Sequence, residues 1–510
     1  MKKNNLGSSY FLLTALVFFA AVFIFSACKK NDHDNDNFPA VNLPRGYNLE
    51  KVVDGLNFPT SLTWDEDKNM YVVEAGGGFL PEPSPARILK VSKGRADEIV
   101  NLSNKNVVAP VVGLTYYNNA FYITHRADDQ TGAVSRVSKD GSAINQILSG
   151  FLDGGSEHPL NSVQMGPDGR MYLCVGPAGN SAVMGPDIAP FINRKPSLHT
   201  TSAKDLVLLG KNFKSEDFRT LHKLDDSVLT GAYMPFGTPS TPGQIIHGTN
   251  KPGGSIVSFD PANAEGTLET VAYGLRNVIG VTWNKKGEMF AAVNGYDVRG
   301  SRPVKDLFDA TYLIKKGTWY GYPDYSLTGE PLTDPTFDSD DKLQAEIFVN
   351  GVSQGKNLGF VIDHAASGLT APDKNLIAGL HPFHSSPSLL DVAPSGWGVY
   401  TGHLFVAEWG DLTPPTDPAI TRVGYRIVEI NPHTKQVVPF LSNVSGLPGS
   451  EQGKAGKVLE RPFDVKFGPD GAMYIVDYGQ VKINLARKAQ DREPYEYIPG
   501  TGVIWKVTKE

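Results

Sequence analysis

The strongest constraint on the fold of this chain is an internal repeat. A unit of apolar strand, turn and second strand, marked by an aromatic residue, occurs six times. The copies span 61–73, 112–123, 162–173, 279–290, 398–406 and 463–476, and their aromatic markers are Tyr71, Tyr122, Tyr172, Phe290, Phe405 and Tyr474. The first markers lie about 50 residues apart, and four-stranded units at this period are typical of a β-propeller. The repeat therefore predicts an all-β fold, a six-bladed β-propeller.

Further strands complete several of these hairpins. Apolar segments at 87–91, 135–137, 255–259 and 426–430 follow the hairpins that precede them. The last apolar segment, 501–507, is predicted to close onto the final or the first blade. Loops from every blade of a propeller converge at the mouth of its central channel, so residues far apart in sequence can form one site.

Two segments are too long to be connections between blades. Residues 184–250 and 318–390 are rich in Pro, Gly and Ser and are predicted to be two long inserted loop regions. Loops of this length in a compact domain tend to be functional lids or interaction surfaces. The whole chain has 53 Gly and 36 Pro in 510 residues, which favours many strands joined by turns. A net charge of -6 without a Lys/Arg cluster predicts no nucleic-acid partner.

The N-terminus resembles a bacterial lipoprotein signal. A basic start is followed by an apolar run over 11–25 and by small residues before Cys28. We predict a signal peptide over 1–28 whose cleavage leaves Cys28 as a lipidated N-terminus. The alternatives are a plain secretory signal and a retained N-terminal anchor.

The residues after Cys28 are expected to form a tether. Residues 29–47 open with a run of Lys, Asn and Asp that cannot bury enough apolar surface to fold, and 48–510 is predicted to be the propeller domain. This organisation predicts a protein of the cell envelope that a lipid anchors to the outer membrane, periplasmic or surface-exposed.

The first motif with chemical content is a histidine ahead of a hairpin. Glu157 and His158 precede a strand and the turn Pro167-Asp168-Gly169, whose residues are those of a tight turn. The histidine therefore stands at a strand entrance, where a rigid β scaffold often displays functional groups. Neutral imidazole accepts a proton near pH 7, so His158 is a candidate general base. The alternative is a solvated loop histidine.

A second motif opens the fourth repeat. Arg276 and Asn277 offer a fixed cation and an amide that can hold a carboxylate or polarise a carbonyl. The alternative is an arginine that links neighbouring blades. Four histidines elsewhere, His364, His381, His384 and His403, match no strong zinc spacing.

These motifs, in this order, resemble the soluble glucose and sorbosone dehydrogenase family, six-bladed propellers that use pyrroloquinoline quinone. In that family a catalytic histidine, preceded by an acidic residue, lies eight residues before a Gly-Pro-Asp turn, as His158 lies before Gly166. The family's Arg-Asn pair matches Arg276 and Asn277, and its calcium-holding turn matches Asn294-Gly295. The segments 312–323, 404–410 and 460–465 also resemble the family.

The resemblance implies oxidation of an aldose or a sorbosone-like sugar with pyrroloquinoline quinone and Ca²⁺. It implies that His158 takes the hydroxyl proton while hydride moves to the quinone, and that Glu157 holds the imidazole or the sugar. It implies that Arg276 stabilises the reduced quinone oxygen and contacts the cofactor together with Asn277, and that Arg461 binds a quinone carboxylate. The calcium ligands would be backbone carbonyls of Asn294 and Gly295. The chain has no Cys-x-x-Cys-His haem motif, so a separate cytochrome or quinone is expected as electron acceptor.

The chain departs from the family at three cofactor positions. Ile279 replaces a glutamine, and Phe463 replaces a second arginine. A family lysine has no match in register, and the nearest cation, Arg422, is assigned as cofactor-binding. A rival interpretation is therefore a non-catalytic propeller that binds glycan or protein at the cell envelope. A calcium-dependent lactonase-type propeller is a third alternative.

Overall fold

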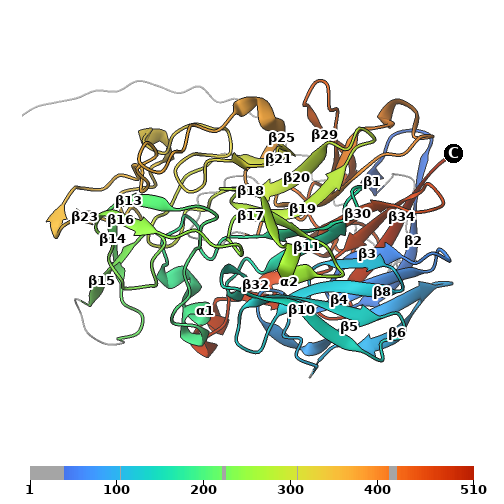
Figure 1. The fold of residues 1–510 in the computed structure, drawn as a ribbon. Coiled ribbons are helices and arrows are strands. Elements are labelled where there is room, and N and C mark those ends of the chain that lie inside the picture. Colours follow the sequence, from blue (N-terminus) through green and yellow to red (C-terminus); the bar gives the residue numbers. More distant parts are fainter. Residues whose placement is uncertain (1–39, 104, 221–225, 307, 413–421) are drawn as a thin grey trace, which may run out of the picture. The chain divides into compact units, whose positions relative to one another are not determined.

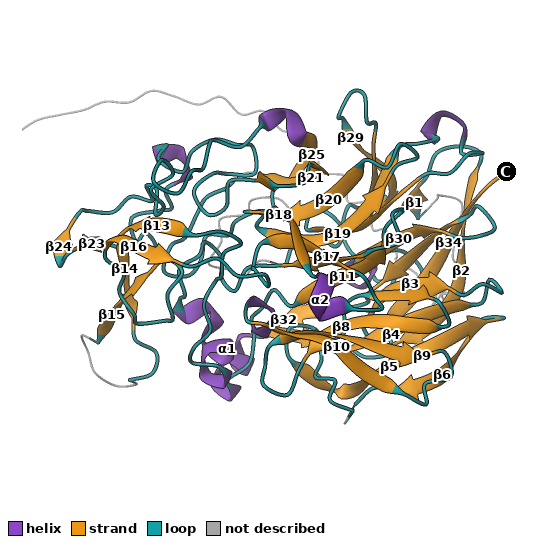
Figure 2. Ribbon diagram, in the orientation of Figure 1, coloured by secondary structure: helices purple, strands orange, loops and turns teal. Residues whose placement is uncertain are grey.

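The structure is a computed structural model that describes residues 40–510 except 104, 221–225, 307 and 413–421. The predicted signal peptide, Cys28 and residues 29–39 of the predicted tether lie outside the described residues. Strands make up most of the regular structure, and the helices are short (Figure 2). The predicted all-β fold is confirmed. In the part of the chain that the structure describes, no helix is both long and apolar enough to span a bilayer.

Each predicted repeat lies in a sheet of its own (Figure 1). Sheet 1 contains β3 (Pro59–Trp64), β4 (Met70–Gly77), β5 (Pro81–Ser92) and β6 (Arg95–Asn101); sheet 2 contains β7 (Leu114–Tyr117), β8 (Ala120–Arg126), β9 (Gly132–Ser138) and β10 (Ile144–Phe151); sheet 3 contains β11 (Leu160–Met165), β12 (Met171–Val175), β17 (Ser255–Phe259), β18 (Glu269–Tyr273) and β22 (Thr318–Trp319). Sheet 4 contains β19 (Asn277–Trp283), β20 (Met289–Asn294), β21 (Phe308–Ile314) and β25 (Ile377–Pro382); sheet 5 contains β26 (Pro387–Val392), β27 (Leu404–Glu408), β28 (Arg426–Ile430), β29 (Val437–Asn443) and β1 (Val41–Asn42); sheet 6 contains β30 (Pro462–Phe467), β31 (Met473–Asp477), β34 (Gly502–Lys509) and β2 (Tyr47–Leu56).

The first strands of neighbouring sheets contact one another in sequence. Contacts join β3 to β7, β7 to β11, β11 to β19, β19 to β26 and β26 to β30, and β30 contacts β3. The loops that enter these strands therefore come from all six sheets, as a propeller requires. The last strand, β34, pairs with β31 and with β2, so it closes onto the final sheet as predicted.

Three of the hairpins share one side-chain contact that explains their recurrence. The marker tyrosine of the second strand donates a hydrogen bond to an aspartate in the turn. The pairs are Tyr71 with Asp65 (3.0 Å), Tyr172 with Asp168 (2.8 Å) and Tyr474 with Asp470 (2.9 Å). In the third repeat Gly169 has a φ of +80°, which glycine adopts without strain. The turn sequence and the aromatic marker thus form one local unit.

The predicted hairpin at 398–406 is wrong in its first half. Gly398–Tyr400 is a short 3₁₀ turn, and the strand that pairs with β27 is β26. Val399 is 81% exposed, whereas Leu389 and Leu390 of β26 are buried, so burial favours the earlier segment as the strand. The start of the domain also differs, because β1 pairs Val41 with Asn443, ahead of the predicted boundary at 48.

The two predicted insertions are not simple loops but share one packed body. The first contains β13 (Leu206–Leu209), β14 (Asn212–Glu216), β15 (Ser227–Gly231) and β16 (Pro242–Ile246), and the second contains β23 (Ile347–Val349) and β24 (Val352–Ser353). Strand β14 pairs with β23, and Figure 1 shows these strands grouped at the left. Phe213 and Ile347 are buried in their common hydrophobic cluster. The second insertion ends before β25 and β26, which belong to sheets 4 and 5, so the predicted limit at 390 is wrong.

A third insertion, within sheet 6, was not predicted. Strand β32 (Val481–Ile483) pairs with β33 (Tyr495–Tyr497) between β31 and β34. Arg492 donates a hydrogen bond of 2.7 Å to Glu82 of β5 and so ties this hairpin to sheet 1. The hairpin brings two tyrosines to the site described below.

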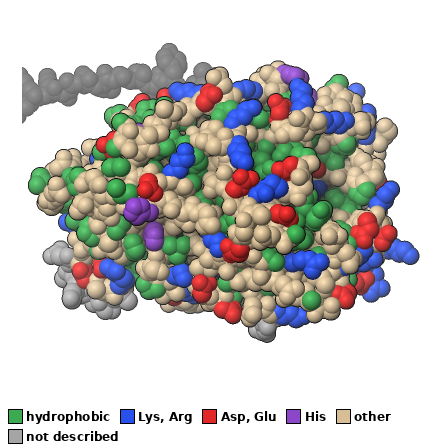
Figure 3. Space-filling model, in the orientation of Figure 1, with side chains coloured by type: hydrophobic (Ala, Val, Ile, Leu, Met, Phe, Trp, Pro, Cys, Tyr) green, Lys and Arg blue, Asp and Glu red, His purple; other side chains and the backbone are tan. Residues whose placement is uncertain are grey.

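Within the described residues the helical elements are few and short. They are α1 (Ala189–Arg194), α2 (Ala264–Thr267) and the 3₁₀ turns η1 (Asp153–Gly155), η2 (Pro186–Ile188), η3 (Pro335–Phe337), η4 (Lys374–Leu376), η5 (Gly398–Tyr400), η6 (Gly449–Gln452) and η7 (Leu485–Gln490). On the face drawn in Figure 3, basic and acidic side chains are interspersed with apolar ones. That face therefore carries no large field of a single sign.

Candidate active site

A cavity of about 270 Å³ is lined by residues that lie in, or just ahead of, the first strand of each of the six sheets. These residues include Thr60 of β3, Val112 ahead of β7, Asn161 of β11, Ile279 of β19, Ser388 of β26 and Phe463 of β30. The structure brings six of the sequence-predicted site residues to this cavity: Glu157, His158, Arg276, Asn277, Asn294 and Gly295. Residues separated by more than a hundred positions therefore form one site, as the propeller prediction implies.

His158 lies just ahead of β11 and is only 5% exposed. Its Nδ1 is 2.7 Å from the backbone carbonyl oxygen of Pro177. Because a carbonyl only accepts, Nδ1 carries the proton and Nε2 carries the lone pair of the neutral ring. Burial, together with the positive charges of Arg276 and Arg299, lowers the pKa of His158 well below its usual range. The side chain is therefore neutral near pH 7 and presents a proton acceptor.

Glu157 does not orient this imidazole. Its Oε1 is 3.7 Å from Nε2 of His158, beyond hydrogen-bond distance, and instead accepts a hydrogen bond of 2.6 Å from Nη2 of Arg299. The Pro177 carbonyl holds the ring. Of the two roles that the resemblance implies for Glu157, the geometry leaves contact with a bound ligand.

Arg276 is buried at the start of the fourth repeat and forms an ion pair inside the site. Its Nη2 donates to Oδ2 of Asp297 at 2.9 Å and to Oδ1 of Asn180 at 2.9 Å. Oδ1 of Asn180 also accepts from the backbone N–H of Asp297 at 2.9 Å, which fixes the carboxylate beside the guanidinium. Burial alone would raise the pKa of Asp297, but Arg276 and Arg299 lower it far below its usual range. Asp297 is therefore ionised.

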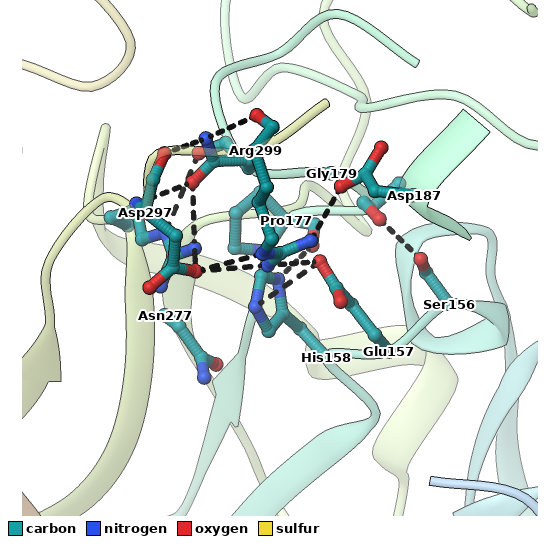
Figure 4. Close-up of polar contacts among 12 residues, drawn as sticks. Ser156, Glu157, His158, Pro177, Gly179, Asp187, Asn277, Asp297 and Arg299 are labelled. Carbon is teal, nitrogen blue, oxygen red and sulfur yellow. Dashed lines mark hydrogen bonds and ion pairs between the residues drawn. The ribbon is translucent and has the colours of Figure 1, made fainter. Parts of the chain in front are cut away.

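Arg299 occupies the centre of three carboxylates. Nε donates to Asp297 at 3.0 Å, Nη1 to Asp187 at 2.6 Å and Nη2 to Glu157 at 2.6 Å. Figure 4 shows its guanidinium reaching over the His158 ring, with Asp297 on one side and Glu157 on the other. Sequence reasoning missed both Asp297 and Arg299. The sequence does contain a signal for them: the triplet Asp297-Val298-Arg299 follows the predicted calcium turn Asn294-Gly295, separated from it by one tyrosine.

Another part of the cavity lining is aromatic. Its members, which we call the aromatic side, are Trp409, Phe463, Tyr478, Tyr495 and Tyr497. Tyr478 is the centre of this group, because its ring centroid lies 6.1 Å from that of Trp409, 6.3 Å from that of Phe463 and 6.2 Å from that of Tyr497. Phe463, which replaces an arginine of the resembled family, thus lines the cavity with an apolar ring.

The two remaining predicted cofactor cations do not line the cavity. Arg461 lies behind Trp409, with its guanidinium 4.2 Å from the ring centroid, and donates to the carbonyls of Gly410 and Asp411 at 3.2 Å each. Arg422 pairs with Glu451 and donates to the Tyr425 hydroxyl at 2.7 Å. Among the described residues that line the cavity, the Lys and Arg side chains are those of Arg276 and Arg299.

The predicted calcium turn lies at the cavity, where backbone groups pack closely. Asn294 ends β20, and the backbone N–H of Gly295 donates to Oδ1 of Asp309 at 2.6 Å. A Cβ at residue 295 would lie 2.6 Å from the carbonyl oxygen of Phe308, so the turn needs glycine. Within the described ranges, no three His, Cys, Asp or Glu side chains are grouped so as to hold a metal ion. A cation here would have to use backbone or amide oxygens and oxygens of a ligand.

The other histidines do not converge on a metal. Each pairs with different carboxylates: His364 with Asp324, His381 with Glu408, His403 with Glu429, and His384 with Asp297 and Asp411. Of these four, His384 lines the cavity. Its Nε2 lies 3.6 Å from Oδ1 of Asp297, which adds a further polar group to the Arg276 side of the site.

Comparison with known proteins gives a likeness in fold and none in sequence. No protein-family model and no curated protein matches the chain. A structure of a Trichoderma reesei Carbohydrate-Active Enzymes Family AA12 protein has a TM-score of 0.52 at 12% identity, covering 93% of this chain and 98% of the other. The pyranose dehydrogenase PQQ domain of Coprinopsis cinerea has a TM-score of 0.51 at 14% identity, covering 92% and 97%. The PQQ-bound aldose sugar dehydrogenase of Streptomyces coelicolor reaches 0.47 at 15% identity, covering 91% and 99%. At these identities the first two establish the β-propeller fold.

Proposed function

We propose that this protein is a sugar dehydrogenase that oxidises the CH–OH group of an aldose or a sorbosone-like sugar with pyrroloquinoline quinone and Ca²⁺. The observation that carries the proposal is the orientation of His158. Its Nδ1–H is fixed on the Pro177 carbonyl, and its unprotonated Nε2 belongs to a cavity that Arg276 also lines. Removal of a hydroxyl proton during hydride transfer needs a neutral, oriented acceptor of this kind.

The residues around His158 support this role. Nε2 would accept the hydroxyl proton, and the imidazolium that forms would be stabilised by the nearby charges of Glu157 and Asp297. The cavity also provides Glu157 as an acceptor for a second hydroxyl of the sugar. The aromatic side would pack against the apolar face of a ring.

The residues that line the cavity support binding of a planar anionic quinone. When bound, the quinone supplies the acceptor for the hydride. Trp409 and Phe463 would cover the face of its ring, and Arg276 and Asn277 would contact its polar edge. Arg276 would supply a fixed positive charge that stabilises the negative charge of the reduced quinone, an effect that often contributes about 3 to 4 kcal/mol to catalysis.

The charges of the site support a requirement for calcium. The cavity is lined by the cations of Arg276 and Arg299 and by the carboxyl groups of Glu157, Asp297 and Asp309. A tricarboxylate adds further negative charge, and burial of uncompensated charge is costly. A divalent cation at the Asn294–Gly295 turn would offset this charge, and Ca²⁺ accepts the oxygen ligands that a turn and a carboxylate provide.

The fold comparisons add support of a general kind. One similar structure belongs to a carbohydrate-active enzyme family and another to a pyranose dehydrogenase PQQ domain. We carry sugar oxidation to this chain as part of the proposal. The proposal also includes lipidation at Cys28, attachment to the outer membrane and transfer of electrons to a separate cytochrome or quinone.

A calorimetric titration tests the proposal directly. The purified full-length chain is titrated with pyrroloquinoline quinone with and without Ca²⁺, and the samples then receive a panel of aldoses and a dye as electron acceptor. We expect calcium-dependent binding and sugar-dependent dye reduction. Absence of binding at cofactor concentrations well above micromolar would contradict the proposal and favour the non-catalytic glycan- or protein-binding alternative.

A matched pair of variants separates cofactor contact from stability. Arg276→Met removes a buried guanidinium from the site, and Arg302→Met removes one that pairs with Asp324 outside the cavity. Each change removes one of the cations that pair with a carboxylate, while Arg299 still pairs with Asp297 and His364 with Asp324, so both should lower the thermal midpoint to a similar extent. Only Arg276→Met should reduce the rate of dye reduction by about a hundredfold or more in correctly folded protein.

A further inference from the structure

We propose that Arg299 is a positioning residue that acts through Glu157 and connects it to the first insertion by way of Asp187. The inference rests on the proposed sugar oxidation for its effect on catalysis, but its geometric content concerns this chain alone. It assigns a role to a residue outside the motifs that the sequence identified.

The geometry of Arg299 is that of a three-way fork. Its Nε, Nη1 and Nη2 each donate to a different carboxylate, at 3.0, 2.6 and 2.6 Å. The three carboxylates come from different parts of the fold: Glu157 precedes β11, Asp187 lies in η2 of the first insertion and Asp297 follows β20. A planar guanidinium can satisfy three directions at once, whereas a lysine ammonium is a point charge on a flexible stem.

The surroundings of Asp187 hold this fork in place. A Cβ on Gly300 would lie 2.8 Å from Oδ1 of Asp187, and one on Gly185 would lie 2.6 Å from the same oxygen. The carboxylate is therefore enclosed by the backbone on either side, next to the residue that carries the guanidinium. Such packing leaves Asp187 little freedom and makes it a fixed anchor for Arg299.

Glu157 is the member of the fork that adjoins His158 in the sequence and lines the cavity beside it. Its Oε1 is occupied by Arg299 and lies 3.7 Å from Nε2 of His158, while the residue lines the cavity. Fixing one carboxylate oxygen sets the direction of the other, so Glu157 can accept a hydrogen bond from a sugar hydroxyl in one defined orientation. Loss of the fork would leave the carboxylate present but misdirected, and orientation is what such residues contribute to rate and to apparent affinity.

The charges around His158 give a second consequence. The groups that face its ring are Glu157, Arg276, Arg299 and Asp297, with the Pro177 carbonyl on Nδ1. In the Arg299→Lys variant the positive charge stays, but Glu157 loses its hydrogen bond and becomes free to pair with a protonated imidazole. The pKa of His158 should therefore rise in this variant, and only while residue 157 is a carboxylate.

A double-mutant cycle tests the proposal on the full chain with Glu157→Gln, Arg299→Lys and the combination of both. The first readout is the pKa of His158. It is measured by NMR on histidine-labelled protein without cofactor, and the His158 signal is assigned by its absence in His158→Gln. The second is sugar-dependent dye reduction by the loaded enzyme, resolved into kcat and KM. Arg219→Lys, which changes a bidentate partner of Asp217 away from the cavity, is the matched control.

We expect Arg299→Lys to raise the pKa of His158 and to raise KM for the sugar about tenfold, the scale of one misdirected hydrogen bond. In the Glu157→Gln background neither quantity should change further, because a residue that acts through Glu157 has nothing to position there. The proposal would be overturned if the effects of Glu157→Gln and Arg299→Lys on KM multiply in the double variant. It would also be overturned if Arg299→Lys leaves the pKa of His158 unchanged. Failure of the wild type to reduce dye would refute the proposed function and leave the NMR cycle as a valid test of Arg299.

Discussion

The polar side and the aromatic side of the cavity lining contribute different kinds of side chain. On the polar side, formed by loops of sheets 3 and 4, Arg276 and Arg299 are each bonded to a carboxylate. The aromatic side is formed by sheets 5 and 6 and the β32–β33 hairpin. There Arg461 does not line the cavity, because its guanidinium packs on Trp409 and donates to backbone carbonyls. The contrast indicates that the polar side would orient and charge-stabilise a ligand, while the aromatic side would contribute apolar contact area.

The largest effect is expected from the polar side. His158→Gln removes the proton acceptor, and general-base catalysis typically contributes about 10² to 10⁴ in rate. We expect sugar-dependent dye reduction to fall about a thousandfold while calorimetry gives an unchanged affinity for the cofactor. His199→Gln, at a half-buried histidine that bonds a nearby backbone carbonyl and does not line the cavity, serves as control. A loss of less than tenfold would move the general base elsewhere.

A smaller effect is expected from the aromatic side. Phe463→Leu keeps an apolar side chain but removes the ring, and an aromatic contact adds about 1 kcal/mol beyond area burial. The dissociation constant of the quinone should rise about fivefold. The rate of dye reduction at saturating cofactor should stay at the wild-type value, as stopped-flow measurement would show. A fall in that rate with unchanged binding would place Phe463 among the groups that orient the reaction.

Arg422 provides a sharper test of the same contrast. The sequence assigns it to the cofactor, whereas the structure pairs it with Glu451 outside the cavity lining. Because exposed ion pairs contribute at most about 1 kcal/mol, Arg422→Ala should change neither cofactor affinity nor rate by more than about twofold. Calorimetry in parallel with Arg276→Met decides the matter. A tenfold loss of affinity in Arg422→Ala would show that the aromatic side supplies charge after all.

The smallest effect is expected from pH. Burial, with Arg276 and Arg299, lowers the pKa of His158, so the base stays neutral as pH falls through the ordinary histidine range near 6.5. The rate of dye reduction by bound cofactor should therefore change by less than about twofold between pH 8 and pH 6. Stability has the matching sign: the unfolded state takes up this proton first, so the free energy of unfolding declines as pH drops below about 6.5. Urea titrations of wild type and His158→Gln would show a steeper decline in the wild type.

The fold was largely readable because its signals are local. Turns such as Pro167-Asp168-Gly169 recur together with an aromatic marker such as Tyr172, whose side chain bonds Asp168 within the same hairpin. The fifth repeat failed because Val399 lies in an apolar stretch that resembles a strand but stays exposed. Nothing in the local pattern distinguishes it from β26.

The site was readable only where a residue adjoins a strand. His158 and Arg276 stand directly before β11 and β19, so the repeat fixes their place in the fold. Asp187 and Arg299 lie in connections, and their meeting depends on the path of an insertion that no spacing encodes. Arg461 lies next to a strand that reaches the cavity, but its side chain does not point into the cavity, because it donates to the backbone carbonyls of residues 410 and 411.

The pairing of β2 with β34 has a consequence for the order of folding. Tyr47 lies opposite Lys509, so sheet 6 joins the two ends of the propeller across nearly the whole chain. Closing a loop of that length costs on the order of 5 kcal/mol in chain entropy, which favours late formation of this contact. During synthesis β2 has no partner strand until β34 has been made. We therefore expect sheet 6 to form last during folding and to separate first when the chain partly unfolds.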